Sequence, residues 1–311
     1  MAAVVVTLPF LPALAEAFRF TQANGLQNYT PLVPLIAAYL GWKGSTGSAG
    51  ERRSPAAVGI RQRVATEDPP GQPQLHRSDW FRFSEPDVAL KIAAPSTAAA
   101  ALVAARFATD PALAAGLRVV ALIGLLAGVL GLTLGRKGFA RWRLPVLLLI
   151  FLAPLPPAVV ATCEQMLQHG SAVCARLLLE ASGTPVHLDR LTLHLRGMTL
   201  WVAPECSGLR SSLVLLFLTA IAAGTLLRTP LARVTLIAAV APIAIARNGL
   251  RIFVIGSMCV EQGPVALDSL LHRQGGPVFF ALSLVPWTFL LLVLCRRENA
   301  ACRPASVSQE K

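Results

Sequence analysis

Residues 208–227, GLRSSLVLLFLTAIAAGTLL, decide the fold class of this chain. The stretch carries a single charge, Arg210, close to its amino-terminal end, and the remainder is apolar, small or hydroxylic. A helix of about 20 such residues is long enough to cross the hydrocarbon core of a bilayer. We therefore expect a membrane-spanning helix that begins just after the tripeptide Cys206-Ser207-Gly208.

Other stretches of the chain predict further membrane-spanning helices. Four of them are as apolar as the first, at residues 115–134, 144–163, 232–250 and 277–295. Three more are shorter or less apolar, at residues 2–18, 30–42 and 93–107. Together they predict an all-α polytopic membrane protein with about eight transmembrane helices.

The overall composition agrees with a chain whose surface faces lipid. Hydrophobic residues make up 54% and charged residues 14% of the sequence, whereas a soluble domain has about 25% charged residues. The net charge of +12 is compatible with nucleic-acid binding. However, the arginines lie in short runs between apolar stretches, and basic and aromatic residues do not alternate as in a nucleic-acid groove. The expected partner is the lipid bilayer, with no nucleic acid.

The basic runs predict the orientation of the helices. They lie at residues 136–143, 228–233 and 296–303, and basic residues are enriched in cytoplasmic loops. Both termini are then inside, and segments 19–29, 108–114, 164–207 and 251–276 are outside. We expect N-terminal transmembrane segments in 1–42, a disordered cytoplasmic insert in 43–92, a transmembrane core in 93–295 and a cytoplasmic tail in 296–311.

The longest outer segment contains a pattern typical of β-structure. Leucines at positions 191, 193 and 195 alternate with polar residues, and the alternation resumes after Arg196-Gly197. A period of two on both sides of an Xaa-Gly turn predicts a β-hairpin over about 186–203. The hairpin leads directly to Cys206.

Three reactive residues from separate segments fall on the same outer side of the predicted topology. Cys206 lies at the start of one span, Arg251 at the end of another, and His272 shortly before the last. A helix N-terminus favours a thiolate, a histidine exchanges protons near neutral pH, and an arginine stabilises an oxyanion. These are the groups that acyl transfer through a thioester needs. The expected catalytic residues are Cys206, Arg251 and His272, with no metal and no cofactor.

Each of these residues also has a simpler interpretation. Cys206 could be a packing residue, Arg251 an interfacial anchor and His272 a solvated loop residue. Arg247 lies one helical turn before Arg251 and competes for the cationic role, while Asn248 could hydrogen-bond between helices. We regard Arg247, Asn248 and Arg210 as candidates for substrate binding.

The remaining cysteines and histidines suggest no metal site. Cys163 and Cys174 both fall on the predicted outer side, where they could form a disulfide or remain structural thiols. His187 and His194 lie in the hairpin region without a third ligand, so we expect them to be solvated.

The motifs around the three reactive residues resemble those of a known family. The similar segments are Ala203–Ser211 with its Cys-Ser-Gly, Pro242–Ile252 with its Asn-x-x-Arg, His272 followed by Gly275, Gly276 and Phe279, and Tyr29–Trp42 near the amino terminus. At these positions the chain resembles the exosortase/archaeosortase family of membrane transpeptidases. The insert at 43–92 departs from the family pattern and leaves the substrate subtype open.

That resemblance implies a specific activity. Cys206 would be the nucleophile, and Arg251 and His272 would share proton donation and transition-state stabilisation. The substrates would be membrane-anchored secreted proteins with a C-terminal tripartite sorting signal of the PEP-CTERM kind, processed at the periplasmic face of the bacterial inner membrane, often alongside exopolysaccharide production.

Two other functions compete with this interpretation. A transporter or polysaccharide-handling membrane protein would use Arg247 and Arg251 to bind an anionic group. It would carry charges near the bilayer midplane and an internal repeat, and the sequence has no evident sign of either. A non-catalytic assembly protein would use Cys206 for packing alone.

Overall fold

The computed structural model of the chain describes residues 10–50, 87–196, 198–204, 207–263 and 276–301, and these residues are predominantly α-helical. The chain divides into two compact units. One comprises residues up to Asn24 together with Asn28–Pro154, and the other comprises Gly25–Gln27 together with the chain from Leu155 onward. The two units are described separately below.

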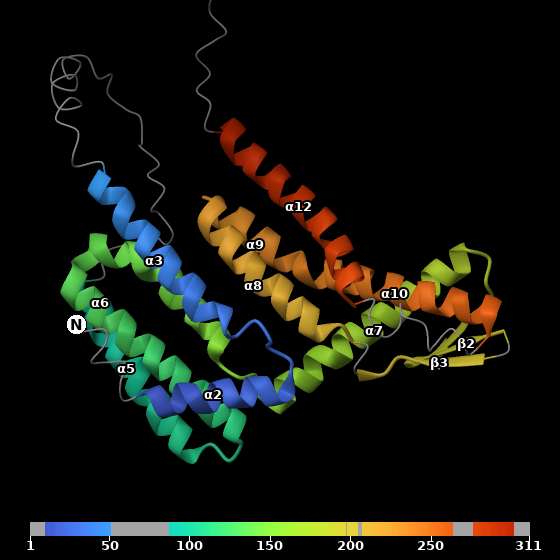
Figure 1. Cartoon of the computed structure of the whole chain (residues 1–311), viewed down its shortest axis with the longest axis horizontal. Helices are drawn as coiled ribbons and strands as arrows, with labels where there is room; N and C mark the ends of the chain where they lie inside the picture. Colours follow the sequence, from blue (N-terminus) through green and yellow to red (C-terminus); the bar gives the residue numbers. More distant parts are fainter. Residues whose placement is uncertain (1–9, 51–86, 197, 205–206, 264–275, 302–311) are drawn as a thin grey trace, which may run out of the picture. The chain divides into compact units, whose positions relative to one another are not determined.

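The first unit is formed by α2 (Leu11–Asn24), α3 (Leu32–Gly50), α5 (Asp87–Phe107), α6 (Pro111–Leu148) and the short 3-10 helix η2 (Leu149–Leu152). Helix α5 packs along α6 (Figure 1). The close approach depends on small residues, since a side chain at Gly124 would lie 3.0 Å from the carbonyl oxygen of Ala94. Helix α6 begins where Asp110 accepts a hydrogen bond from the Ala112 amide, and it is interrupted at Gly135, which has a positive φ of 66°.

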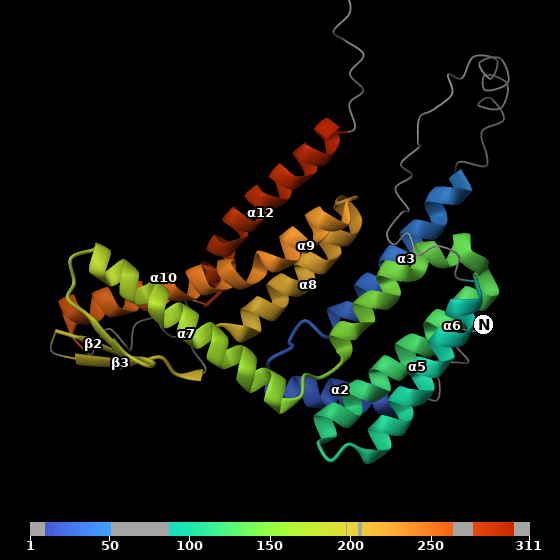
Figure 2. The ribbon, with the colours of Figure 1, turned by 180° about the vertical axis from the view of Figure 1, so that it is seen from behind.

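The second unit contains the predicted reactive segments. Its helices are α7 (Pro157–Ala181), α8 (Leu209–Leu226), α9 (Pro230–Ala238), α10 (Val240–Gln262) and α12 (Gly276–Ala301). Helices α7 and α10 cross and make extensive contact (Figure 2). Glycines permit this contact, because a Cβ at Gly249 would lie 2.6 Å from Cys174 Sγ and one at Gly170 would lie 2.8 Å from Ile245 Cδ1.

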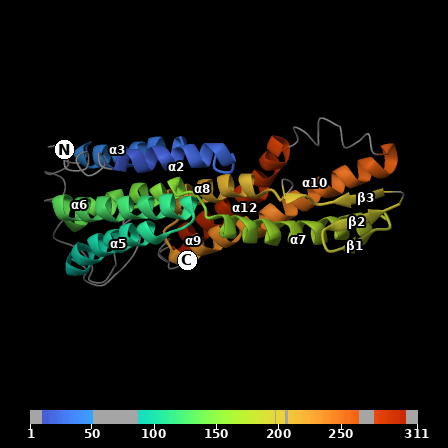
Figure 3. The same ribbon diagram turned by 90° about the horizontal axis from the view of Figure 1, so that it is seen from below.

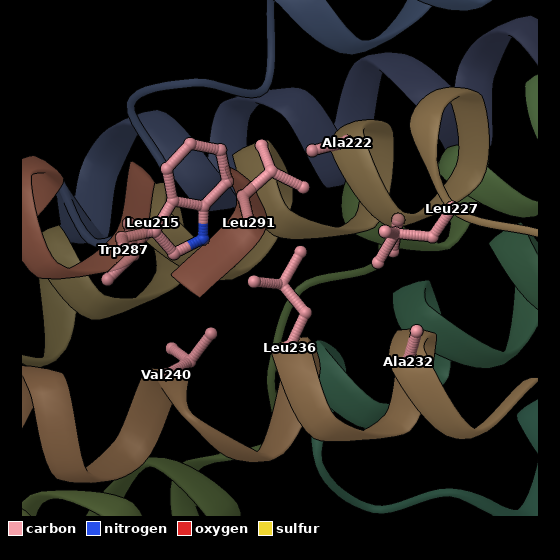
Figure 4. Packing of buried hydrophobic residues seen from close by; sticks show 9 residues of the cluster. Leu215, Ala222, Leu227, Ala232, Leu236, Val240, Trp287 and Leu291 are labelled. Atoms are coloured by element: carbon pink, nitrogen blue, oxygen red, sulfur yellow. The ribbon is translucent and has the colours of Figure 1, made fainter. Parts of the chain in front are cut away.

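A cluster of apolar side chains holds α8, α9, α10 and α12 together. Leu215 of α8, Leu236 of α9, Val240 of α10 and Trp287 of α12 are buried and point toward one another (Figure 4). The indole nitrogen of Trp287 donates a 2.8 Å hydrogen bond to the hydroxyl of Thr219, so the one polar atom of this side chain is also satisfied.

The predicted β-hairpin is confirmed, with an additional strand. Strands β1 (His187–Asp189), β2 (Thr192–Leu195) and β3 (Met198–Trp201) form an antiparallel sheet in the order β1-β2-β3. Leu195 pairs with Met198 across the predicted turn. The sheet lies beside α7 and α10 (Figure 3), and Leu193 packs with Ala172, Ala175 and Ile252 of these helices. The alternating leucines therefore face the helices.

The count of about eight spans is not confirmed. Among the described residues, four helices are long and apolar enough to cross a membrane: Pro111–Gly135, Leu209–Leu226, Pro230–Glu261 and Gly276–Ala300. A fifth span results if Gly138–Leu152 and Pro157–Ala181 are counted together. The predicted span 144–163 is interrupted because Pro154, Pro156 and Pro157 lack amide hydrogens and restrict the residues before them. All five strongly apolar stretches thus correspond to helices or helix pairs of a multi-pass membrane protein.

The three weaker stretches do not appear among the described helices that could cross a membrane. Helix α2 has 14 residues, and the stretch before it lies outside the described residues. The apolar part of α3 is short, at Leu32–Lys43. Helix α5 is not among the described helices that are long and apolar enough to cross a membrane. Helix α3 extends to Gly50 and α5 starts at Asp87, while the rest of the 43–92 insert lies outside the described residues.

Two predicted outer segments are more helical than expected. Helix α7 continues through residues 164–181 and α10 continues through 251–262. The continuation of α10 has a packing reason, since Ile252 and Ile255 are buried against the hairpin residues Leu193 and Met198. The helical path of α7 also excludes the Cys163–Cys174 disulfide. The two free thiols are eleven residues apart on one helix, about 16 Å along its axis.

Candidate functional site

The expected site residues are distributed unevenly over the structure. Arg251, Arg247 and Asn248 lie on α10 and Arg210 lies on α8. Cys206 and His272 lie outside the described residues. The described part of the site therefore consists of the residues on either side of Cys206, up to Val202 and from Gly208, and of the helices that contact these residues.

The chain entering the Cys206 segment is fixed at Val202, just after β3. The amide of Val202 donates a 2.9 Å hydrogen bond to the carbonyl oxygen of Leu191, and its own carbonyl oxygen accepts a 3.0 Å hydrogen bond from Gln168 Nε2. Both side chains are buried, Val202 at 2% exposure and Gln168 at 4%. Both backbone polar groups of Val202 are thus satisfied, one by the sheet and one by α7.

The chain leaving the segment is fixed at Gly208. This residue has a left-handed φ of 74° and stands at the N-cap of α8. Its carbonyl oxygen accepts hydrogen bonds from the Ser211 hydroxyl at 3.0 Å, from the Ser212 amide at 3.0 Å and from the Ser212 hydroxyl at 2.8 Å. Arg247 Nη2 adds a further donor at 3.0 Å.

Arg247 therefore reaches from α10 to the first turn of α8. Its side chain is 6% exposed, and Nη2 also lies 3.4 Å from the Ser212 hydroxyl. A Cβ at Gly208 would lie 2.7 Å from this nitrogen and 3.3 Å from Asn248 Oδ1. A side chain at position 208 would therefore be strained by the αL backbone and would displace the Arg247 guanidinium, so both effects favour glycine.

These contacts join two of the sequence motifs. Gly208 closes the Cys-Ser-Gly tripeptide, and Asn248 opens the Asn-x-x-Arg sequence that ends at Arg251. Asn248 is 2% exposed and Arg251 is half-buried. Residues at i and i+4 share one face of a helix, so Arg251 lies one turn beyond Arg247 on the face that meets α8. Arg247 thus contacts the first turn of α8, and Arg251 lies one turn farther along α10.

Arg210, the third substrate-binding candidate, is exposed on the first turn of α8. Its Nη2 lies 3.1 Å from the position that a Cβ of Gly25 would occupy. Leu26 packs near Leu209 and Leu167 in the same region. Residues 25–27, predicted to be in an outer loop, thus contact the end of α8 that carries the candidate site.

The opposite end of α8 carries the predicted cytoplasmic charges. The Glu298 carboxylate accepts hydrogen bonds from the amides of Arg228 and Thr229 at 2.8 and 2.7 Å, and from the Thr229 hydroxyl at 2.6 Å. Arg233 donates from Nη2 to the Leu227 carbonyl at 2.8 Å. With 18 residues, α8 separates this basic end from Gly208 by about 27 Å. The site and the basic cluster therefore lie at opposite ends of one membrane-spanning helix.

The two hairpin histidines lie apart from these contacts. His187 and His194 are exposed, and their rings stack with centroids 6.2 Å apart across β1 and β2. Their exposure agrees with the expected solvated role. Gln168, in contrast, was missed by the sequence analysis. Its partner Val202 is 34 residues away, and α7 carries other polar residues that give no hint which of them is buried.

The chain matches a known protein family. The protein-family model described as transmembrane exosortase matches residues 75–289, more than two thirds of the chain. The match contains Cys206, Arg251 and His272, while the similar segment Tyr29–Trp42 lies before it. No curated protein and no solved structure matches the chain significantly.

Proposed function

Because the chain belongs to the transmembrane exosortase family, we propose that it is a membrane cysteine transpeptidase. It cleaves the C-terminal sorting signals of membrane-anchored secreted proteins through a thioester on Cys206. Exosortase membership and the multi-pass helical fold support the class of protein. The assignment of the individual residues is our inference.

One observation carries the proposal, namely the contact of Gly208 with Arg247 and Asn248. Consecutive Cα atoms are 3.8 Å apart, so the Cα atom of residue 206 is within about 7.6 Å of that of Gly208 by covalent connectivity alone. Arg251 lies three residues, just under one turn, beyond Asn248 on the same helix. These relationships support our proposal that the cysteine of one motif and the arginine of the other act at one site.

The proposed reaction has two steps. The Cys206 thiolate attacks the carbonyl carbon of the scissile peptide, and Arg251 stabilises the resulting oxyanion. Collapse of this intermediate breaks the C–N bond, and the leaving amine takes a proton from His272. The passenger is then bound to Cys206 as a thioester. Attack by an amine or by water, deprotonated by His272, releases the passenger and restores the thiolate.

The two ends of α8 support the proposed orientation. The end near Arg228, Arg233 and Arg296 carries the basic residues that favour the cytoplasm. The site at the other end would face the periplasm of a bacterial inner membrane.

A substrate tail made of a short motif, an apolar helix and a basic end would diffuse in the bilayer plane to this site. Such in-plane binding lowers the entropy cost of bringing the scissile bond to the thiolate. We extend the proposal to sorting of the PEP-CTERM kind in exopolysaccharide-producing cells.

Co-expression with a tailed substrate tests the function. The substrate should be shortened by the wild-type protein but not by Cys206→Ala. Cys259→Ala is a matched control, since Cys259 is a buried thiol on α10 close to the hairpin, and it should process like the wild type. If Cys206→Ala processes the substrate at the wild-type level, catalysis by Cys206 is excluded, and a transporter or polysaccharide-handling role is favoured.

A further inference from the structure

We infer that Gln168 is a positioning residue for the segment that carries the nucleophile, an inference that rests on the function proposed above. We call residues 203–207 the nucleophile segment. We propose no direct contact between Gln168 and the substrate. It acts by fixing the carbonyl group of Val202, at which the nucleophile segment begins.

The hydrogen bond from Gln168 is made in a buried environment. Gln168 is 4% exposed, and its Nε2 donates to the Val202 carbonyl oxygen at 3.0 Å. Around it, Ala172 and Ala175 of α7 pack with Leu193 and Val202. A buried carbonyl that loses its donor has no water to replace it, so the bond favours a single position of the Val202 peptide.

The other end of the nucleophile segment is fixed from a different helix. Arg247 of α10 donates to the Gly208 carbonyl at 3.0 Å. Five residues, 203–207, thus connect two peptide groups that are each held by a buried side chain. We infer that holding Val202 and Gly208, the two described residues that flank the segment, contributes to preorganising the nucleophile.

The two fixing residues are themselves linked by the contact between α7 and α10. Gly170, two residues after Gln168, is so close to Ile245 that an added Cβ would lie 2.8 Å from Ile245 Cδ1. Ile245 precedes Arg247 by two residues. Gln168 and Arg247 therefore lie close to a direct packing contact between α7 and α10.

The test compares Gln168→Met with Thr219→Val in the full chain. Gln168→Met keeps the length and approximate volume of the side chain but removes the donor. Thr219→Val also removes one buried hydrogen bond, the 2.8 Å bond to Trp287, in the cluster formed by α8 and α12. Both variants should lower the melting temperature. A purely structural role predicts similar effects on activity, whereas a positioning role predicts an effect of Gln168→Met alone.

Three quantities are measured on the purified full-length protein in lipid nanodiscs. They are the melting temperature, kcat and KM for a tailed substrate, and the pH profile of iodoacetamide alkylation of the Cys206 peptide by mass spectrometry. We expect Gln168→Met to lower kcat about 10- to 100-fold and to shift the alkylation profile, since a misplacement of about 1 Å can cost about 100-fold. Thr219→Val should change kcat less than about twofold and leave the profile unshifted.

Specific outcomes would overturn the inference. Equal activity losses in Gln168→Met and Thr219→Val at matched melting temperatures would show that Gln168 has only a structural role. A wild-type kcat in Gln168→Met would show that Gln168 has no role in positioning the nucleophile. If Gln168→Met does not fold, Gln168→Leu carries the same test, because it also removes the donor and adds no charge to the buried site. Wild-type processing by Cys206→Ala would instead refute the proposed function, so the two failures are distinguishable.

Discussion

Arg247 Nη2 donates a 3.0 Å hydrogen bond to the carbonyl oxygen of Gly208, across 39 residues of sequence. This bond ties the N-cap of α8 to the middle of α10 and thereby joins the Cys-Ser-Gly and Asn-x-x-Arg motifs. The carbonyl oxygen already accepts from Ser211 and Ser212, so the first turn of α8 is held by several donors at once.

Gly208→Ala should strongly reduce processing. An alanine in the left-handed region costs about 1–2 kcal/mol. In addition, its Cβ would lie 2.7 Å from Arg247 Nη2, so the guanidinium would have to move away from the Gly208 carbonyl. Processing of a tailed substrate in cells, compared at equal protein levels, measures the effect.

Gly183→Ala is the matched control for Gly208→Ala. Gly183 also has a positive φ, at 80°, but an added Cβ would meet nothing within 4 Å. It should cost similar backbone strain and leave processing nearly unchanged. Equal losses in both variants would show that strain alone, and not displacement of Arg247, explains the Gly208 phenotype.

Arg251→Lys should reduce kcat by about 100-fold or more. Removal of one oxyanion donor typically costs about 100- to 1,000-fold, and lysine does not reproduce the planar arrangement of guanidinium donors. Arg176→Lys, in the half-exposed pair with Glu180 on α7, is the control and should retain most activity. Single-turnover kinetics of acylation separate the chemical step from binding. An unchanged acylation rate in Arg251→Lys would exclude Arg251 from the reaction.

Gly249→Ala should destabilise the contact between α7 and α10. The added Cβ would lie 2.6 Å from both Cβ and Sγ of Cys174 and 3.2 Å from the Ser171 carbonyl oxygen. Overpacking of this kind typically costs about 1–3 kcal/mol. Thermal unfolding in detergent measures the loss of stability.

The partner of this change is Cys174→Gly, which removes both crowded atoms. If the packing explanation holds, the double variant should be more stable than the sum of the two single variants predicts. Additive effects would contradict the direct contact between Gly249 and Cys174.

Glu298→Ala should lower the free energy of unfolding by about 2–3 kcal/mol. The amides of Arg228 and Thr229 would lose their acceptor. Hydrogen bonds to a charged group contribute about 1.5–3 kcal/mol. Glu180→Ala is the control. Glu180 forms a half-exposed i,i+4 pair with Arg176, which contributes about 0.5 kcal/mol or less. Melting temperatures of the two variants should therefore differ clearly, and similar values would contradict a capping role of Glu298.

Much of the helical framework could be predicted from local sequence. The five strongly apolar stretches correspond to helices or helix pairs, and the alternating leucines at 191, 193 and 195 correspond to strand β2 and the turn before it. These features depend on residues close in sequence. Apolar length alone does not reveal the interruption near Pro154, which three closely spaced prolines cause. The extension of α10 was missed because its packing partner is the hairpin.

The site was predictable only in outline. Position relative to the spans placed Cys206 and Arg251 on one side, and the structure brings the surrounding motifs together at Gly208 and Asn248. The supporting contacts join residues 34 to 70 positions apart, such as Gln168 with Val202 and Arg228 with Glu298. No local period encodes such pairs, so Gln168 and Glu298 became recognisable only once the helices were packed.

The central claim is that Cys206 carries the passenger as a thioester, and its most direct test is mass spectrometry of the acylated enzyme. After brief exposure to a tailed substrate, the protein is denatured in acid, digested and mapped. We predict an adduct of the passenger fragment on the Cys206 peptide that is released by neutral hydroxylamine and is absent from Cys206→Ala. Substrate cleavage with the Cys206 peptide unmodified at every time point, and undiminished in Cys206→Ala, would contradict the account.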